Sequence, residues 1–257
     1  MRPMATHDFA LSFDTVAAEY AAARPGYPPA LFNAVEELTG RPFPGARTLD
    51  IGAGTGIATR LLRDRGARVT AVEPGPGMAA QLRQSLPDVP LVRADGNALP
   101  FAAATADLIT YAQSWHWTDQ ARSVPEALRV LRPGGALAVW WNVPDPDTEW
   151  TAAQEARLAR VLPGYHGHGI TDEAVAIIKR HAPTPLDPVF RRLHWARRIP
   201  LDTHLAHLGS RSYFAVMGKS AAAPVLAAER AELLTLFPDG IVEEAYALDL
   251  TVARTSH

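Results

Sequence analysis

The sequence predicts an α/β fold in which helices cover both faces of a mostly parallel sheet. Along residues 47–142, short runs rich in Val, Ile and Leu alternate with helical segments, the pattern of parallel strands joined by crossover helices. Three glycines at alternate positions, Gly52, Gly54 and Gly56, connect the first strand to its helix. The second strand ends in an acidic residue, Glu73, which in a doubly wound sheet lies beside that glycine turn.

The strands are expected where apolar runs are short and bounded by turn residues. In chain order they span residues 48–51, 68–72, 91–93, 107–111, 135–141 and 189–199, with a last strand near 243–254. Helices are expected over residues 13–20, 29–38, 58–65, 120–131, 150–161, 172–181 and 202–208, and near 78–85 and 221–236. We interpret residues 1–257 as a single domain with an N-terminal helical arm (1–40) and a cap insertion (143–187).

Proline and glycine mark the boundaries of these elements. Pro25 and Pro28 prevent the first helix from continuing, and Pro29 suits the first turn of the next one. The segment Pro133–Gly135 predicts a sharp turn from a helix into the fifth strand.

Composition excludes several classes of protein and site. Of 257 residues 47% are hydrophobic and 20% charged, as in a globular protein with a core. A net charge of −2 predicts no general affinity for nucleic acid or an anionic membrane. The absence of cysteine excludes disulfides, thiolate metal sites and a cysteine nucleophile. Because no stretch of about 18 apolar residues and no signal-peptide pattern is present, we expect a cytoplasmic protein.

The glycine turn and Glu73 together predict a site for an adenosine-containing ligand. A carboxylate at that place can accept both ribose hydroxyls, as in sites for NAD, FAD and S-adenosylmethionine; the alternative is a solvated strand-end carboxylate. Ile57 stands where the dinucleotide fingerprint has its third glycine, which disfavours a pyrophosphate at this helix N-terminus. Asp95, after the third strand, can accept a hydrogen bond from an adenine amine.

Four segments, taken in order, resemble the class I S-adenosylmethionine-dependent methyltransferases: Leu49–Gly56, Val72–Glu73, Ala94–Phe101 and Leu131–Gly135. The resemblance extends over residues 10–142. It implies a Rossmann-like seven-stranded sheet in the order 3-2-1-4-5-7-6, with strand seven antiparallel. Further residues resemble the trans-aconitate methyltransferase-like branch of small-molecule enzymes: Phe13–Ala17, Tyr20, Arg24–Pro25, Tyr27–Pro28, Ala112–Gln113 and His116–Trp117.

The resemblance implies contacts with the amino-acid part of the cofactor. Gly52, Gly54 and Gly56 would let the backbone lie against it. Asp50 would orient the turn or meet the cofactor ammonium through water, and a backbone carbonyl at Gln113 would face the same ammonium. Tyr20 and Arg24 would close over the cofactor, with Arg24 as partner for its carboxylate. The alternative for these two is helix packing and a surface charge.

The resemblance also implies contacts with the nucleoside. Glu73 would hold the ribose diol, while Pro74 and Met78 would flank the adenine. Asp95 would meet the adenine amine, and Gly96 or Asn97 would add a polar contact.

The acceptor side of the site is expected just beyond strand four, at the carboxyl ends of the strands. Trp115 and Trp117 offer aromatic faces that suit a sulfonium or an apolar substrate. His116 is the candidate general base because its ordinary pKa is near neutral; positioning of ligands and plain packing are the alternatives. Asn142, at the end of strand five, is a candidate substrate contact, and one of the adjacent tryptophans, Trp140 and Trp141, is expected in the core.

The second half of the chain offers weaker candidates. Arg211 and Tyr213 are candidate substrate contacts. Arg191, Arg192, Arg197 and Arg198 form a basic cluster, interpreted first as a solvated strand face and alternatively as a site for a substrate carboxylate or nucleic acid. His166 and His168 suggest a mobile lid more than a metal site, because no carboxylate cluster is near them in sequence, and we expect no metal.

We therefore predict S-adenosylmethionine-dependent methyl transfer to a small molecule by in-line displacement. The protein would supply alignment and a dry site. The alternatives are another reaction of the same cofactor, such as its cyclisation with release of methylthioadenosine, or a non-catalytic cofactor-binding protein. The expected partners are a small-molecule substrate, with no nucleic acid and no membrane, in a monomer or homodimer.

Overall fold

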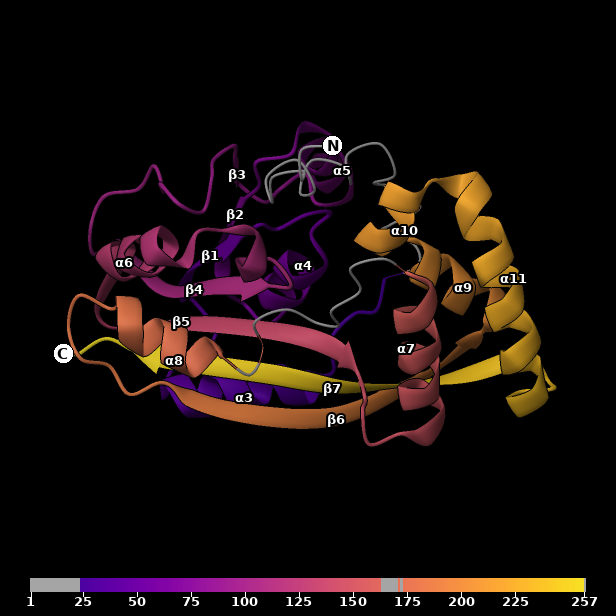
Figure 1. The fold of residues 1–257 in the computed structure, drawn as a ribbon. Helices are drawn as coiled ribbons and strands as arrows, with labels where there is room; N and C mark the ends of the chain where they lie inside the picture. Colours follow the sequence, from indigo (N-terminus) through magenta and orange to yellow (C-terminus); the bar gives the residue numbers. More distant parts are fainter. Residues whose placement is uncertain (1–23, 163–170, 172, 257) are drawn as a thin grey trace. The chain divides into compact units, whose positions relative to one another are not determined.

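The computed structural model describes residues 24–162, 171 and 173–256 (Figure 1). The chain divides into two compact units. Of the described residues, the larger unit takes 26–142, 171, 173–193 and 248–256, and the smaller unit takes 24–25, 143–162 and 194–247. The cap predicted from the sequence, residues 143–187, does not coincide with the smaller unit. The interpretation of the chain as a single domain with an arm and a cap stays a prediction.

A seven-stranded sheet runs in the order β3-β2-β1-β4-β5-β7-β6, which confirms the order that the resemblance implied. The strands are β1 (Arg47–Ile51), β2 (Arg68–Val72), β3 (Leu91–Val92), β4 (Ala106–Ala112), β5 (Leu131–Pro144), β6 (Val189–Pro200) and β7 (Ile241–Arg254). The first five strands pair in parallel; Leu49 of β1, for example, lies opposite Thr70 of β2 and Ile109 of β4. The carboxyl ends of these strands therefore lie at one edge, where such sheets bind ligands.

Strand β7 is antiparallel to its neighbours. The N–H of Thr255 bonds to the carbonyl of Gly135, while the N–H of Asp145 bonds to the carbonyl of Ala245, so β5 and β7 run in opposite directions. β5 extends beyond the predicted 135–141 at both ends, where Leu131 pairs with Ala106 of β4 and Asp145 bonds to Ala245 of β7. Between β6 and β7, side-chain ion pairs join Arg192 to Asp249 and Arg197 to Glu244, again with opposite chain directions.

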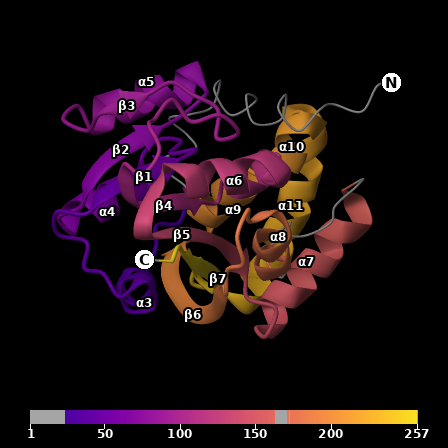
Figure 2. The same cartoon turned by 90° about the vertical axis from the view of Figure 1, so that its left-hand side faces the viewer.

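In the larger unit α3 (Pro29–Thr39) and α4 (Ile57–Asp64) lie on one face of the sheet, with α6 (Gln120–Val130) and α8 (Ala174–His181) on the other (Figure 2). α8 packs against α6. The remaining helix of this unit is α5 (Pro76–Ser85). As predicted, Pro29 is the first residue of α3; Gly40, at φ 64°, ends that helix in the left-handed conformation.

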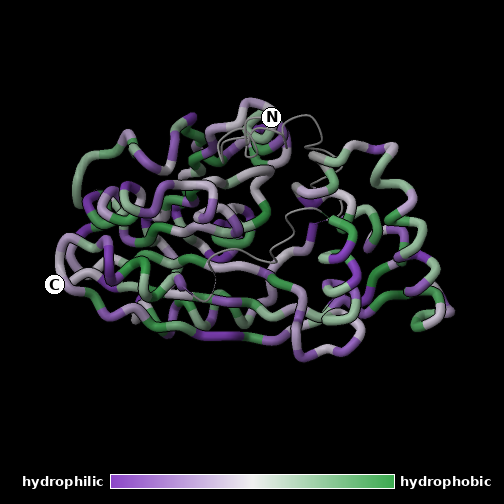
Figure 3. Tube along the Cα trace, in the orientation of Figure 1, coloured by the Kyte–Doolittle hydropathy of each residue, from purple (hydrophilic) through white to green (hydrophobic). Residues whose placement is uncertain are grey.

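The core of the larger unit is built on β4 and β5. Nearly every residue of these strands is buried, and hydrophobic stretches follow both strands along the trace (Figure 3). Tyr111, Trp115 and Trp140 are among the largest fully buried side chains. Continuous apolar runs of this kind are expected where a sheet is covered on both faces.

The smaller unit consists mainly of helices, together with parts of β6 and β7. Its helices are α7 (Glu149–Val161), α9 (Leu201–Gly209), α10 (Ser212–Met217) and α11 (Lys219–Leu236). The six-residue α10 was not predicted, because so short an element shows no full helical period. Leu158, Leu208 and Phe214 form one apolar cluster of this unit, and Leu205 and Leu233 belong to another. No helix among the described residues is long and apolar enough to cross a membrane.

Candidate cofactor and acceptor site

The three glycines of the turn after β1 have different surroundings, although all three have positive φ angles of 66°, 57° and 90°. A Cβ at Gly52 would lie 2.5 Å from the Cβ of Ser114, and a Cβ at Gly56 would lie 2.8 Å from Leu86 Cδ1. At Gly54 no described atom lies within 4 Å of that place. Packing against Ser114 therefore requires glycine at position 52, and the positive φ favours glycine at position 56, whereas Gly54 leaves backbone open to a ligand.

Glu73 organises this turn. One carboxylate oxygen accepts the N–H of Gly54 and the other accepts the N–H of Gly75, both at 2.8 Å. The residue is only 7% exposed, so it is not the solvated strand-end carboxylate of the alternative interpretation. Each carboxylate oxygen has more than one lone pair, so the arrangement fits a ribose diol as well, and that role stays a prediction.

Asp50 ties β1 to its neighbours. It is fully buried, and its two oxygens accept the hydroxyls of Thr59 on α4 (2.6 Å) and Thr110 on β4 (2.9 Å). Burial raises the pKa of this carboxyl to about 6, against the opposing effect of the two hydroxyl bonds. Two roles were expected for Asp50, orienting the glycine turn or meeting the cofactor ammonium through water. Its hydrogen bonds to Thr59 and Thr110 match the first of these.

The loop after β3 presents an exposed carboxylate. Asp95 accepts the backbone N–H of Asn97 at 2.9 Å and is exposed, which leaves it accessible to an adenine amine. Asn97 is itself occupied, since its side-chain oxygen accepts the N–H of Asp119 at 2.8 Å. Gly96 is tightly enclosed: a Cβ there would lie 3.1 Å from side-chain atoms of both Ile51 and Thr118.

The two residues predicted to flank the adenine differ in exposure. Met78, on α5, is 5% exposed and therefore packed among protein atoms. Pro74 is partly exposed, and its carbonyl accepts a hydrogen bond from Arg93. The adenine contacts stay predictions.

The chain changes direction at Gln113, directly after β4. Its φ of 59° is unusual for a residue with a side chain, and such strained positions cluster at functional sites. Its N–H bonds to the carbonyl of Trp140 and its side-chain amide to the carbonyl of Asn142, at 2.9 and 3.0 Å. Next to it, the Ser114 hydroxyl donates to the carbonyl of Ile51 at 2.6 Å. Sequence reasoning missed Ser114, although a small polar residue after the strand was a usable signal.

Residues Trp115–Trp117 form a 3-10 turn with three different side-chain environments. Trp115 is fully buried and its indole N–H donates to Ser123 at 3.1 Å, so it is a packing residue here. The half-buried His116 ring accepts the indole N–H of Trp141 at its Nδ1, at 3.0 Å. The ring of Trp117 lies 4.5 Å from that of His116, centroid to centroid.

Asn142 and Trp140 complete this part of the site on β5. The Asn142 side chain is 6% exposed and donates to the carbonyl of Gly26 at 3.0 Å, which joins the strand end to the segment before α3. Trp140 is fully buried, which fits the expectation that one of the adjacent tryptophans lies in the core.

Comparisons with known proteins assign the chain to a family. The methyltransferase domain model matches residues 49–139. An uncharacterized methyltransferase of Mycobacterium tuberculosis is 35% identical over 207 residues, which cover 80% of this chain and 79% of the relative. The chain belongs to the S-adenosylmethionine-dependent methyltransferases.

Solved structures extend the likeness over the whole methyltransferase fold. A candidate type II methyltransferase from Anaeromyxobacter dehalogenans superposes with a TM-score of 0.60 at 28% identity, covering 91% of this chain and 99% of that one. The [4+2]-cyclase SpnF superposes with a TM-score of 0.58 at 17% identity, covering 100% and 98%. The second likeness concerns the fold alone.

In the smaller unit of the methyltransferase, the two candidate substrate residues have protein partners. Arg211 donates to Glu155 at 2.8 Å, and Tyr213 packs against the apolar cluster that contains Leu158. Burial lowers the pKa of His207 to about 4, and the charges of Arg24 and Arg211 add to this effect. Their roles toward cofactor and substrate stay predictions. Tyr20, His166 and His168 lie outside the described residues.

The four arginines of β6 all have acidic partners. Arg191 bonds Glu37 with two contacts of 2.6 and 2.9 Å, and Arg192 bonds Asp249 with two of the same lengths. Two further pairs are Arg197 with Glu244 at 2.6 Å and Arg198 with Asp239 at 3.9 Å. The cluster is therefore charge-compensated, which argues against an anion-binding or nucleic-acid surface.

A buried network around Glu244 in the smaller unit was not predicted. Glu244 is 3% exposed and contacts Arg197, His204 and Tyr246 at 2.6 Å each. Burial alone would raise its pKa, but hydrogen bonds from His204 and His207 hold that pKa well below its usual range.

Glu229 extends this network at a second buried position. At 4% exposure, it pairs with Arg157 through two contacts of 2.8 Å and accepts from Gln154 at 3.1 Å. Its partners lie 72 and 75 positions away in sequence, too far for a local motif to reveal.

Within the described residues, one group of side chains has the composition of a metal site. Ligand atoms of Asp145, Asp147 and His194 lie within 4.8 Å of one another. Asp147 and His194 are exposed, and His194 Nδ1 is 2.8 Å from Asp145, so the group is also explained by a hydrogen bond between these two side chains.

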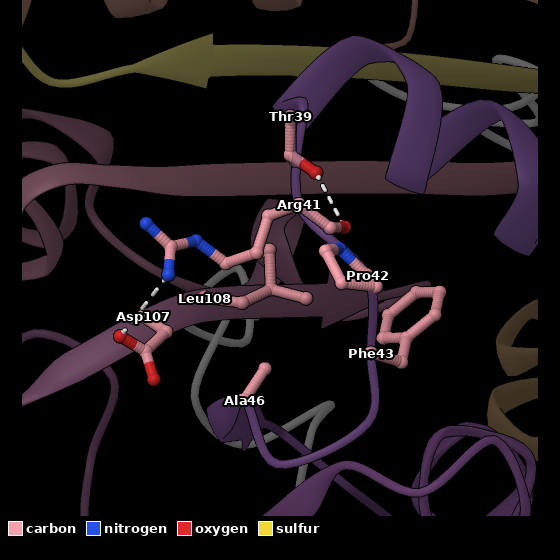
Figure 4. Close-up of a pocket in the computed structure, with 7 residues that line it drawn as sticks. All are labelled: Thr39, Arg41, Pro42, Phe43, Ala46, Asp107 and Leu108. Carbon is pink, nitrogen blue, oxygen red and sulfur yellow. Dashed lines mark hydrogen bonds and ion pairs between the residues drawn. The ribbon is translucent and has the colours of Figure 1, made fainter.

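A small cavity lies near the start of β4, beside Asp107 and Leu108 (Figure 4). Its lining includes Arg41 and Phe43 on one side and Asp107, near the start of β4, on the other. Its volume of about 10 Å³ suits a single water molecule, so it has no room for a substrate.

Proposed function

We propose that this methyltransferase transfers its methyl group to a small-molecule acceptor. The observation that carries the proposal is the segment 114–117 beside the glycine turn. Ser114 packs against Gly52, Trp115 anchors the segment in the core, and the half-buried rings of His116 and Trp117 follow. Aromatic rings at the carboxyl edge of a sheet suit a small apolar or planar ligand. The compensated arginines of β6 speak against nucleic acid as the acceptor.

The larger unit fits S-adenosylmethionine through three features. The open backbone at Gly54 would lie against its amino-acid part, Glu73 would hold the ribose, and the exposed Asp95 would meet the adenine. When bound, the cofactor supplies a sulfonium methyl group for in-line displacement. The protein residues align the acceptor and exclude water.

On the acceptor side we assign contacts to His116, Trp117 and Asn142, which all belong to the larger unit. The fully buried Trp115 is left out of this set. Membership of the trans-aconitate methyltransferase-like branch, a cytoplasmic location and a monomeric or homodimeric state belong to the same proposal.

The test is product analysis by mass spectrometry. The purified protein is incubated with S-adenosylmethionine alone, with a metabolite extract that passes a small-pore filter, and with the retained macromolecular fraction. S-adenosylhomocysteine formed only with the filtrate supports a small-molecule acceptor. Its formation only with the macromolecular fraction would refute the proposal.

The incubation with S-adenosylmethionine alone distinguishes methyl transfer from other reactions of the cofactor. Methylthioadenosine formed without a second substrate, together with a cyclic product from the amino-acid part and faster than in a control without protein, would mean that the enzyme cyclises its cofactor. The shared fold of the [4+2]-cyclase is one reason to include this arm, because a fold alone does not determine the reaction. Glu73→Ala serves as the control that should reduce every cofactor-dependent product.

A further inference from the structure

The contact between Trp141 and His116 determines the protonation of the histidine ring. The Trp141 indole N–H donates to His116 Nδ1 at 3.0 Å, and Trp141 is only 2% exposed. An indole nitrogen can donate a hydrogen bond but cannot accept one. Nδ1 must therefore present its lone pair, and the proton of the neutral ring must be on Nε2.

We propose that Trp141 is a positioning residue that fixes His116 as the neutral Nε2–H tautomer, so that His116 serves the acceptor as a hydrogen-bond donor and not as a general base. In this state neither nitrogen can take up a proton while the contact with Trp141 lasts. The acceptor offers a lone pair to Nε2–H and is not deprotonated by this ring. The contact with the acceptor rests on the proposed function, whereas the tautomer does not.

The surroundings of the pair hold this geometry before any ligand binds. The 3-10 turn that carries His116 is closed by a 3.0 Å bond from the N–H of Trp117 to the carbonyl of Ser114. The Trp141 ring lies 6.2 Å from the ring of Trp115 and 6.5 Å from that of His116, centroid to centroid. Because Trp115 is buried and bonded to Ser123, the indole of Trp141 has a packed neighbour that fixes its direction.

The chain supplies a matched control at the preceding position. Trp140 is also buried on β5, but its indole N–H has no hydrogen-bond partner within the described residues. Trp140→Phe and Trp141→Phe thus remove the same group from two adjacent tryptophans, and only Trp141→Phe breaks a bond to His116. Any general effect of a smaller ring on β5 should appear in both variants.

The tautomer is read directly by nitrogen-15 nuclear magnetic resonance of the histidine side chains at neutral pH. The His116 signal is assigned by its loss in His116→Gln. We expect an unprotonated Nδ1 and a protonated Nε2 in the wild type and in Trp140→Phe, and a mixture of tautomers or a charged ring in Trp141→Phe. A protonated Nδ1 in the wild type would overturn the proposal, whatever the enzyme acts on.

Activity gives the second measurement once an acceptor is found. A glutamine side chain can donate a hydrogen bond but cannot act as a base. We expect kcat/KM of His116→Gln to stay within about tenfold of the wild type, and His116→Ala to lose more. If His116 were the base, both variants would lose roughly 10²–10⁴-fold and the pH profile would lose its acidic limb. That result would refute the donor role, while a failed acceptor search would leave the resonance result as the deciding one.

Discussion

The two units of this methyltransferase hold their buried carboxylates in different ways. In the larger unit, Asp50 and Glu73 accept hydrogen bonds from neutral donors, which are threonine hydroxyls and backbone amides. In the smaller unit, Glu244 and Glu229 are bonded to arginine and histidine side chains. At Asp50 the effect of burial on the pKa exceeds that of the hydroxyl hydrogen bonds, whereas at Glu244 the hydrogen bonds from His204, His207 and Tyr246 exceed the effect of burial. The pKa of Asp50 is therefore raised above its ordinary value, whereas that of Glu244 is lowered.

The pH response of folding follows from these shifts. Burial raises the pKa of Asp50 from 3.8 to about 6, so folding takes up a proton there and the contribution of Asp50 becomes more stabilising as the pH falls through this range. Burial lowers the pKa of His207 from 6.5 to about 4, so its contribution is present above the unfolded value and is lost as the pH falls through about 4. Glu244, whose pKa is lowered, also loses its contribution in acid.

The largest expected effect comes from removing the carboxylate of Glu244. In Glu244→Ala, the buried side chains of His204 and Tyr246 and the partly buried Arg197 lose their common acceptor, so we expect the free energy of unfolding to fall by about 3–5 kcal/mol. Urea unfolding measures it. The neighbouring Glu243 is exposed, and Glu243→Ala should stay within about 0.5 kcal/mol of the wild type. Equal losses in the two variants would show that the network does not stabilise the smaller unit.

Asp50→Asn tests the larger unit. Removing the charge should abolish a contribution worth up to about 3 kcal/mol, which in the wild type lowers stability as the pH rises from about 4 to about 7. We expect the variant to gain stability relative to the wild type on going from acid to neutral pH. The measurement is urea unfolding of both proteins at several pH values in that range. A difference between them that stays constant with pH would contradict the assigned shift.

The smallest expected effect concerns cofactor affinity. Glu73→Ala and Asp95→Ala should each weaken S-adenosylmethionine binding by about 1–3 kcal/mol, the range for a lost hydrogen bond to a charged group. Because Asp95 is exposed, its variant should keep the unfolding free energy of the wild type, whereas Glu73→Ala also releases the N–H groups of Gly54 and Gly75. Calorimetry with the cofactor measures the affinities. Unchanged affinity in both variants would remove Glu73 and Asp95 from the cofactor site.

Features of the fold and the site could be predicted from the sequence where the interacting residues lie close together along the chain. The bounds of β2 were predicted to the residue, and the glycine turn and Glu73 were found because motif and partner lie within a few positions of each other. The extension of β5 beyond its predicted bounds involves partners outside its local sequence, Ala106 of β4 at one end and Ala245 of β7 at the other. The Glu244 network likewise joins residues that are distant in sequence and have no local pattern.

At the site, sequence identified His116 but not its state. The residue type allowed a base, a donor or a packing residue, and only the position of Trp141 decides which nitrogen carries the proton. Trp115, in the same segment, was expected to contact the substrate, but its side chain is fully buried. Burial and hydrogen-bond partners depend on tertiary structure, and composition and spacing do not encode them locally.

The two outermost strands of the sheet have a consequence for behaviour at high protein concentration. An outer strand exposes unpaired backbone groups to which a strand of another molecule can bind. β3 has only two residues, so it offers little to bind. β6 is twelve residues long, but it carries four charged arginines and ends at Pro200. Both outer strands thus carry features that oppose aggregation through added strands.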